Sequence, residues 1–219
     1  MKITQFWLRI MGLLGILGGL LLFAGDMLFY YDSSSTNFLL NMGNASDSRI
    51  IWSGITALVA AWFYVIGVGQ VYMAFQPVKP LVRIIVVFCF ASIMISYGII
   101  HGAYLAIATT AKLAVVNQLD IEASTALAYK ANQALRNIIY PIFGIVSILF
   151  IYQVWRRKTL YPRWMILFFP AIPFVVQGVL EPLLTGKWRI IILGGFLNLI
   201  MVVFFTASTV ALWNKKIRN

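Results

Sequence analysis

Three ionisable side chains lie inside or at the edge of long apolar runs, namely Asp26, His101 and Glu181. A charge in hydrocarbon costs roughly 2.5–3.5 kcal/mol on insertion scales, so such groups persist where they face a protein interior or a wet cavity. Asn198, in the last apolar run, is uncharged but is also costly to bury without a hydrogen-bond partner. These four residues predict a functional site within the apolar part of the chain.

The chemistry that these groups could perform is general acid–base catalysis, with a carboxylate orienting the imidazole. A divalent metal would accept the same donors, but their spacing along the sequence matches no metal motif. HExxH, GxSxG, P-loop and GxGxxG patterns are all missing, so zinc proteolysis, phosphoryl transfer from ATP and dinucleotide chemistry are unsupported. We therefore expect Asp26, His101 and Glu181 to be catalytic, with no metal and no cofactor.

The composition indicates an integral membrane protein. Of the 219 residues, 62% are hydrophobic and only 11% are charged, with a mean hydropathy of +0.90. Soluble domains carry about 25% charged residues, so lipid must replace water over most of this surface. At roughly 20 residues per crossing, six helices nearly exhaust the chain, which predicts a single domain over residues 1–219.

Six apolar runs predict an all-α fold, a polytopic bundle of six transmembrane helices. The runs cover about residues 6–29, 50–75, 84–110, 138–155, 164–185 and 190–213. Eleven of the 17 Lys and Arg residues fall on the side of the two termini, so the positive-inside rule places both termini in the cytoplasm. We interpret the net charge of +11 as a signal of topology and of contact with membrane lipids, and not of nucleic-acid binding.

Two connections on the outer side are long. Residues 32–49 are rich in Ser, Asn and Gly and are typical of a flexible loop. Residues 111–137 carry apolar residues at helical spacing. They either extend the third and fourth helices beyond the membrane or form a lid over a cavity.

Helix geometry places Asp26 on a packed face. Gly15 and Gly19 form a small-residue motif of the kind that lets membrane helices approach closely. The eleven residues from Gly15 to Asp26 span about three whole turns, so Gly15 and Asp26 share one face. The alternative is an aspartate that simply reaches water at the end of the helix.

The other candidates also share helix faces with polar neighbours. Tyr97, His101 and Tyr104 are spaced by four and three residues, which predicts a polar pocket or a structural histidine. Gln177 and Glu181 lie four residues apart, and Glu181 is either a site residue or a surface group paired with Lys187 or Arg189. Asn198 is four residues from Gly194, as expected of an interhelical hydrogen bond.

These positions are expected to lie at a similar depth in the membrane. Asp26, His101 and Glu181 come late in outward-running helices, whereas Asn198 comes early in an inward-running one. Trp52 and Ser53 open the second helix at the same level. We therefore expect one polar site in the outer half of the bundle, with ligand contacts from Tyr97, Tyr104, Gln177, Asn198, Trp52 and Ser53.

Three functions fit such a site. The first is binding or transformation of a lipid or small amphipathic molecule by acid–base chemistry. The second is proton- or cation-coupled transport through a relay of Asp26, His101 and Glu181. The third is a non-catalytic membrane partner, such as an immunity, sensing or assembly subunit, in which the polar groups only hold the helices together.

Three segments carry a resemblance to a known kind of protein. They are the opening from Gly12 to Tyr31, the Tyr97–Tyr104 segment and the Gln177–Pro182 segment. Together they resemble an uncharacterised family of bacterial multi-pass membrane proteins, over most of the chain. The resemblance implies a location in the bacterial inner (plasma) membrane, and it implies no activity.

Overall fold

A computed structural model describes residues 5–215, and three of the basic residues assigned to the side of the termini (Lys2, Lys216 and Arg218) lie outside that range. The described residues form helices and the loops that connect them, with no strand among them. Its elements, in chain order, are α1 (Gln5–Tyr30), α2 (Phe38–Asn44), α3 (Asp47–Ala74), α4 (Pro80–Val116), α5 (Ile121–Trp155), the 3₁₀ turn η1 (Arg163–Phe168), α6 (Ala171–Leu180), the 3₁₀ turn η2 (Glu181–Leu183), α7 (Gly186–Gly194) and α8 (Phe196–Leu212).

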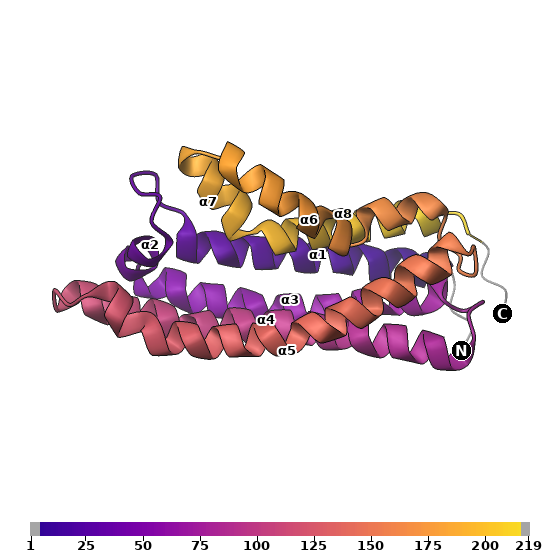
Figure 1. Ribbon diagram of the computed structural model, residues 1–219, viewed down its shortest axis with the longest axis horizontal. Coiled ribbons are helices and arrows are strands. Elements are labelled where there is room, and N and C mark those ends of the chain that lie inside the picture. The colour runs from indigo at the N-terminus through magenta and orange to yellow at the C-terminus, as the bar shows by residue number, and fades with distance from the viewer. Residues whose placement is uncertain (1–4, 216–219) are drawn as a thin grey trace.

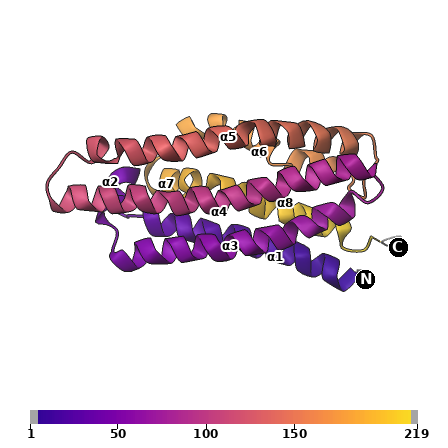
Figure 2. The ribbon, with the colours of Figure 1, turned by 90° about the horizontal axis from the view of Figure 1, so that it is seen from below.

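The long helices lie side by side along one axis (Figures 1 and 2). α1 packs against α3 and α8, while α4 packs against α3 and α5. The two ends of the described chain meet, because the Gln5 amide donates to the Leu212 carbonyl at 2.8 Å. We call this the terminal end of the bundle and the opposite one the distal end. The chain therefore runs along the bundle an even number of times.

Within residues 5–215, four helices are long and apolar enough to cross a membrane, namely α1, α3, α4 and α5. A fifth is obtained if α7 and α8, which meet at an angle of 61°, count as one bent span. The predicted span 164–185 does not form one helix, because it is divided among η1, α6 and η2. Pro170 and Pro182 lie at two of these breaks, and a proline lacks the N–H that would continue the helical hydrogen bonds.

Residues 111–137 extend the two neighbouring helices. α4 continues to Val116, and α5 begins at Ile121, where the Asp120 carboxylate accepts a hydrogen bond from the Ala123 amide. The predicted span that starts at residue 138 is therefore the second half of a 35-residue helix. This extension gives the bundle a long helical hairpin at its distal end, as Figure 1 shows.

The segment predicted as a flexible loop, 32–49, contains the short helix α2. The Asn37 side chain accepts a hydrogen bond from the Leu40 amide and so starts that helix. Before it, the Ser34 amide and hydroxyl both donate to the Asp32 carboxylate, which lowers the pKa of Asp32. Asn41 ties α2 to the end of α1 by donating to the Tyr30 carbonyl at 2.8 Å.

An aromatic core fills the terminal half of the bundle. Phe150 stacks on Phe169 with ring centroids 4.4 Å apart, and Phe90 stacks on Phe204 at 5.2 Å. All four side chains are buried. Large rings therefore close this half, and the polar side chains considered above lie in the other half.

Close contact between α1 and α3 depends on glycines that face each other. A Cβ atom built on Gly67 would lie 2.9 Å from the Cα atom of Gly15, which is closer than real Cβ atoms come. The two backbones can therefore touch because Gly67 lacks a side chain. A Cβ atom on Gly15 would meet α8 instead, 2.5 Å from the Phe205 ring. The contact between α1 and α3 sets how α1 presents Asp26 to its neighbours.

Replacing Gly67 with alanine should destabilise the bundle by about 1–3 kcal/mol, as overpacking does in other cores. The matched control is Gly144→Ala, because a Cβ atom at Gly144 would meet nothing within 4 Å. Gly144→Ala should be neutral or slightly stabilising, since alanine favours helix. Thermal unfolding of the two purified variants in detergent checks this, and equal melting temperatures would contradict it.

Candidate functional site

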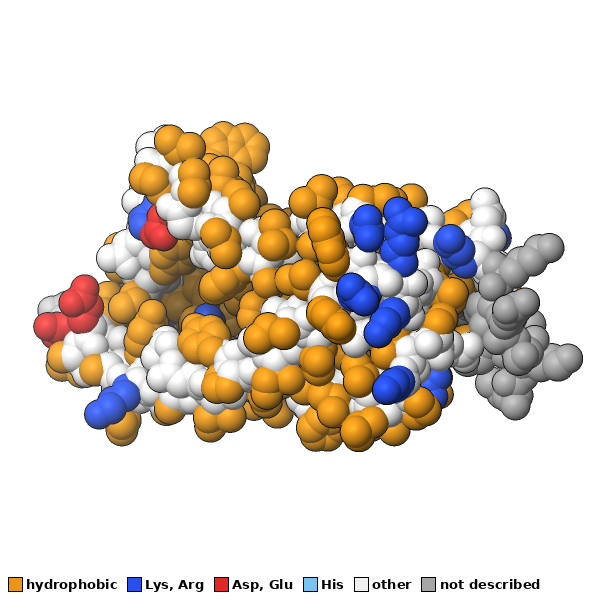
Figure 3. All heavy atoms as spheres, turned by 45° about the vertical axis from the view of Figure 1, so that its right-hand side comes forward, with side chains coloured by type: hydrophobic (Ala, Val, Ile, Leu, Met, Phe, Trp, Pro, Cys, Tyr) orange, Lys and Arg blue, Asp and Glu red, His pale blue; other side chains and the backbone are white. Residues whose placement is uncertain are grey.

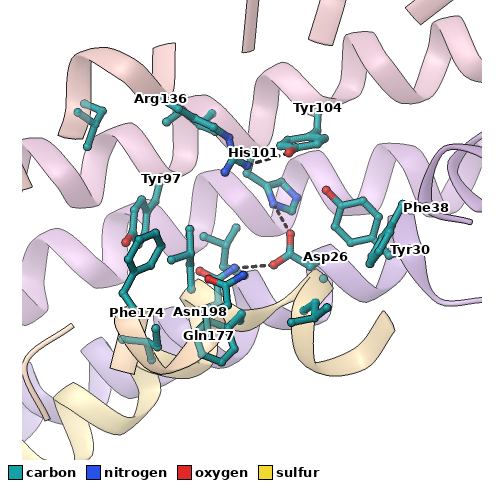
Figure 4. Close-up of a pocket in the computed structure, with 18 of the residues that line it drawn as sticks. Asp26, Tyr30, Phe38, Tyr97, His101, Tyr104, Arg136, Phe174, Gln177 and Asn198 are labelled. Carbon is teal, nitrogen blue, oxygen red and sulfur yellow. Dashed lines mark hydrogen bonds and ion pairs between the residues drawn. The ribbon is translucent and has the colours of Figure 1, made fainter. Parts of the chain in front are cut away.

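Asp26 and His101 form a buried pair between α1 and α4. Asp26 lies one turn before the end of α1, and His101 lies in the middle of α4. The Nδ1 atom of His101 is 3.1 Å from Oδ1 of Asp26 (Figure 4), and the two residues are only 5% and 8% exposed. The face of α1 that carries Asp26 is therefore packed, as the glycine spacing predicted.

Asn198 holds the other oxygen of the same carboxylate. Its Nδ2 donates to Oδ2 of Asp26 at 2.6 Å, and its Oδ1 accepts from the Tyr64 hydroxyl at 3.2 Å. Asn198 lies in the first turn of α8 and Tyr64 in α3. Four helices thus meet at Asp26, and both of its oxygens have a protein partner.

Ser53, on α3, determines where the protons of His101 lie. Its hydroxyl oxygen is 2.7 Å from the Gly25 carbonyl and 2.8 Å from Nε2 of His101. A carbonyl oxygen can only accept and a serine has a single proton, so Ser53 donates to Gly25. Nε2 of His101 must then carry a proton and donate it to Ser53.

We infer that the Asp26–His101 contact holds one proton, because Nδ1 and Oδ1 lie 3.1 Å apart, at ion-pair distance. Because Nε2 is already protonated, the proton between Nδ1 and Oδ1 belongs either to an imidazolium beside a carboxylate or to a carboxylic acid beside a neutral imidazole. The pair has zero net charge in both forms. A pair without net charge is the form in which such groups can be buried at low cost.

The order Ser53–His101–Asp26 is also that of a serine hydrolase triad, but the hydrogen bonds run differently. In a triad the serine donates to the histidine and faces the substrate. Here Ser53 donates to a carbonyl, is fully buried and is not among the residues that line the cavity described below. Ser53 therefore anchors His101 and is no nucleophile.

A cavity of about 660 Å³ adjoins the pair. Its walls come from α1, α2, α4, α5, α6, α7 and α8, and the space-filling view shows the molecule hollowed on the face where α5 and the α6–α7 arm diverge (Figure 3). Most of the wall is apolar, with Leu22, Ile139, Phe143, Phe174 and Leu197 among the lining residues. Asp26, His101 and Asn198 form a polar area in that wall.

The predicted ligand contacts are divided between this cavity and the rest of the bundle. Tyr97, Tyr104 and Gln177 line the cavity, as Asn198 does, and the first three come from α4 and α6 (Figure 4). Trp52 does not, because its side chain points outward from α3 and is 58% exposed. Successive helical residues point about 100° apart, so the inward position of Ser53 forces Trp52 outward.

Glu181 lines the cavity but does not join the Asp26–His101 pair. Its carboxylate lies 3.5 Å from the Arg189 guanidinium, and both side chains are about half exposed. Arg189 is one of the two surface partners that the sequence suggested for it. The structure thus brings together Asp26, His101 and Asn198, with Glu181 in a separate ion pair.

Arg136 is the cavity residue that the sequence analysis missed. It was counted only among the basic residues of the outer side, because α5 was expected to begin at residue 138. In the structure Arg136 lines the cavity beside Tyr129 and Tyr140, which lie on the same face of α5. Their spacing of seven and four residues was the available signal.

Comparison with known proteins gives a family and no activity. A model of a family of unknown function (DUF6796) matches residues 1–215. The chain belongs to that family. No curated protein and no solved structure matches it. Within the described residues, no three His, Cys, Asp or Glu side chains are grouped so that they could hold a metal ion.

The buried pair should show strong energetic coupling in a double-mutant cycle. Asp26→Leu and His101→Leu should each cost about 3–5 kcal/mol of stability, since each leaves an unpaired buried group. The double variant should cost less than the sum, with a coupling energy of about 0.5–3 kcal/mol. Unfolding of the purified variants in mixed detergent micelles measures this.

The control cycle uses Lys112, which is partly buried, and Asp47, which is exposed; they form a surface ion pair between α4 and the start of α3. Exposed pairs contribute about 0–1 kcal/mol, so Lys112→Ala and Asp47→Ala should be nearly additive. Additive costs at Asp26 and His101 would mean that these two side chains do not interact.

Proposed function

We propose that the protein crosses the membrane six times, with a broken fifth crossing made by η1, α6 and η2. The described ends of the chain lie together, as an even number of crossings requires. Large apolar side chains are exposed along the helices, for example Phe88 at 70% and Ile148 at 71%, which suits a surface covered by lipid.

The positive-inside rule supports a cytoplasmic terminal end in a bacterial plasma membrane. Basic residues gather there, on the α3–α4 turn and on the connection from α5 to η1, including Lys79, Arg83, Arg156, Arg157 and Arg163. Figure 3 shows Lys and Arg side chains clustered at one end of the molecule and hydrophobic side chains over much of the rest.

Within this membrane setting, we propose that the cavity binds a lipid or a small amphipathic molecule. The observation that carries the proposal is the cavity itself, a space of about 660 Å³ with a mainly apolar wall and a few polar groups from separate helices. Small-molecule sites have this size and this composition. The apolar wall suits a hydrocarbon tail, and the polar area at Asp26 suits a polar head.

Asp26 is the member of the pair that can act on such a head. Both ring nitrogens of His101 are engaged, by Ser53 and by Asp26. Each carboxylate oxygen of Asp26 has one protein partner and keeps a lone pair for another donor. We propose that Asp26 accepts a hydrogen bond or a proton from the ligand and that His101 holds the shared proton.

We prefer this function to the two alternatives. A transport relay needs a polar path through the whole bundle. In the terminal half, buried aromatic rings such as Phe150 and Phe169 pack beside a buried polar cluster, which consists of Gln70, Tyr161, Ser208 and Thr209. Among the described residues, no hydrogen bond joins that cluster to Asp26 or His101. A non-catalytic partner held together by polar groups needs only a closed bundle, whereas this one has a cavity.

Filling the cavity should displace the ligand. Ile139→Trp places a large ring in the cavity, whereas Ile138→Trp changes the neighbouring residue, which points outward and is 66% exposed. Mass spectrometry of lipids and small amphiphiles that co-purify with each protein in a neutral detergent measures occupancy. We expect at least one species to be retained by wild type and Ile138→Trp but to fall about tenfold with Ile139→Trp, a change of about 1.4 kcal/mol.

Identical retention by all three proteins would contradict the binding proposal. The acid–base step has its own comparison, between cells that produce wild type and cells that produce Asp26→Asn at equal levels. Asparagine keeps the shape of Asp26 but cannot carry its proton. A difference in lipid composition between the wild-type cells and the Asp26→Asn cells supports conversion of the ligand. Identical compositions in the two kinds of cells contradict it.

A further inference from the structure

We propose that the cavity selects an amphiphile with an anionic oxygen head, a phosphate or carboxylate, and that Arg136 binds this head. The inference rests on the amphiphile site proposed above and names the class of its ligand. It starts from the charges that face the cavity. Asp26 is paired with His101, and Glu181 is paired with Arg189.

Arg136 is the cation that remains. None of the six Asp and Glu side chains of the chain, all of which the structure describes, lies within 4 Å of its guanidinium. A lining residue with one uncompensated positive charge, in a largely apolar wall, attracts an anion more strongly than the same charge would in water. One negative charge on the ligand completes the site.

Arg136 is also held in position. Its Nε donates to Oδ1 of Asn132 at 3.1 Å, and Nδ2 of Asn132 donates to the Ile100 carbonyl at 2.9 Å. Its Nη2 donates to the Tyr104 hydroxyl at 2.8 Å, which Figure 4 shows as a dashed line. Asn132 is 3% exposed, so a buried amide fixes the guanidinium against α4 before any ligand arrives.

The bonds that fix Arg136 leave donors for a ligand. A guanidinium has five N–H groups, and these two contacts use one at Nε and one at Nη2. The other three, including both on Nη1, make no hydrogen bond to the described residues. Two parallel N–H groups on the outer edge of arginine match a phosphate or carboxylate. Tyr104 accepts from Arg136, so its own proton is free to donate to the same anion.

The binding test uses dodecyl phosphate, with dodecyl maltoside as the neutral background detergent and inorganic phosphate as the anion without a tail. Native mass spectrometry and the shift in melting temperature report binding by the complete purified protein. We expect wild type to bind dodecyl phosphate and to be stabilised by it, with no shift from inorganic phosphate at the same concentration. An equal shift from inorganic phosphate would overturn the lipid source of the anion.

Variants at Arg136 test the assignment of the head. Arg136→Gln should weaken binding of dodecyl phosphate at least tenfold, and Arg136→Lys should be intermediate because it keeps the charge but loses the fork. The control, Lys130→Gln, removes the same charge from an exposed position on α5 that does not line the cavity, and it should bind like wild type. Melting temperatures without ligand confirm that each variant is folded.

The outcomes separate this inference from the function on which it rests. If dodecyl phosphate binds equally to wild type and to Arg136→Gln, or if both Arg136 variants and Lys130→Gln weaken binding alike, the head assignment is wrong. If Ile139→Trp displaces co-purified neutral species while wild type shows no preference for dodecyl phosphate, the amphiphile site stands and only its anionic class fails. If neither kind of amphiphile is retained by wild type, the function itself fails.

Discussion

The structure is organised around one requirement of Asp26 and His101. Ionisable groups inside an apolar bundle must carry no net charge as a pair and must find polar partners. Four helices contribute to meeting it. α1 supplies Asp26 and the Gly25 carbonyl, α3 supplies Ser53, α4 supplies His101, and α8 supplies Asn198. Removing any one of these partners leaves a buried polar atom unsatisfied, which is costly in a low-dielectric interior.

The requirement also explains why the helices must approach so closely there. A Cβ atom at Gly25 would lie 2.3 Å from the Thr56 hydroxyl oxygen and 3.3 Å from Nε2 of His101, so any side chain at Gly25 would push α3 and α4 away. Packing that is this close can form only where one conformation satisfies all partners at once. The distal half of the bundle is thus closely packed on the α1–α3 side and open on the α5–α6 side, where the cavity lies.

Polar and apolar groups are arranged in the cavity as an amphiphile would need them. The shared proton at Asp26 and the guanidinium of Arg136 both face it, and the rest of the wall is mainly hydrocarbon and aromatic. The prolines that break the segment after α5 keep that segment from closing over the cavity as a straight helix would. The broken segment and the open side of the cavity are therefore two aspects of one feature.

The sequence predicted the groups whose environment follows from local helix geometry. The glycine spacing placed Asp26 on a packed face, and the spacing of Tyr97, His101 and Tyr104 placed three side chains together on one cavity wall. It could not predict which groups pair across helices, since rotation and depth of separate helices are set by packing. Asp26 is therefore buried beside His101 whereas Glu181 forms a half-exposed ion pair with Arg189, although the sequence analysis expected both carboxylates to be catalytic.

Two failures have a more specific cause. Arg136 was missed because hydropathy marks only the apolar part of a helix. Residues 111–137 were placed beyond the membrane, as an extension of two helices or as a lid, and their basic residues were used only to assign topology. The continuous fifth span was expected because the apolar composition of 164–185 outweighed its prolines, whereas the structure divides it into η1, α6 and η2. Hydropathy measures neither where a helix ends nor where it breaks.

The most direct measurement of the central claim is nitrogen NMR of the imidazole, since His101 is the only histidine in the chain and needs no assignment in protein labelled with ¹⁵N-histidine and free of a histidine tag. The account predicts a proton covalently bound at Nε2, protected from exchange by Ser53, and an Nδ1 signal that shifts when Asp26 is replaced with asparagine. An Nε2 without a proton, or an Nδ1 signal indifferent to that replacement, would contradict it.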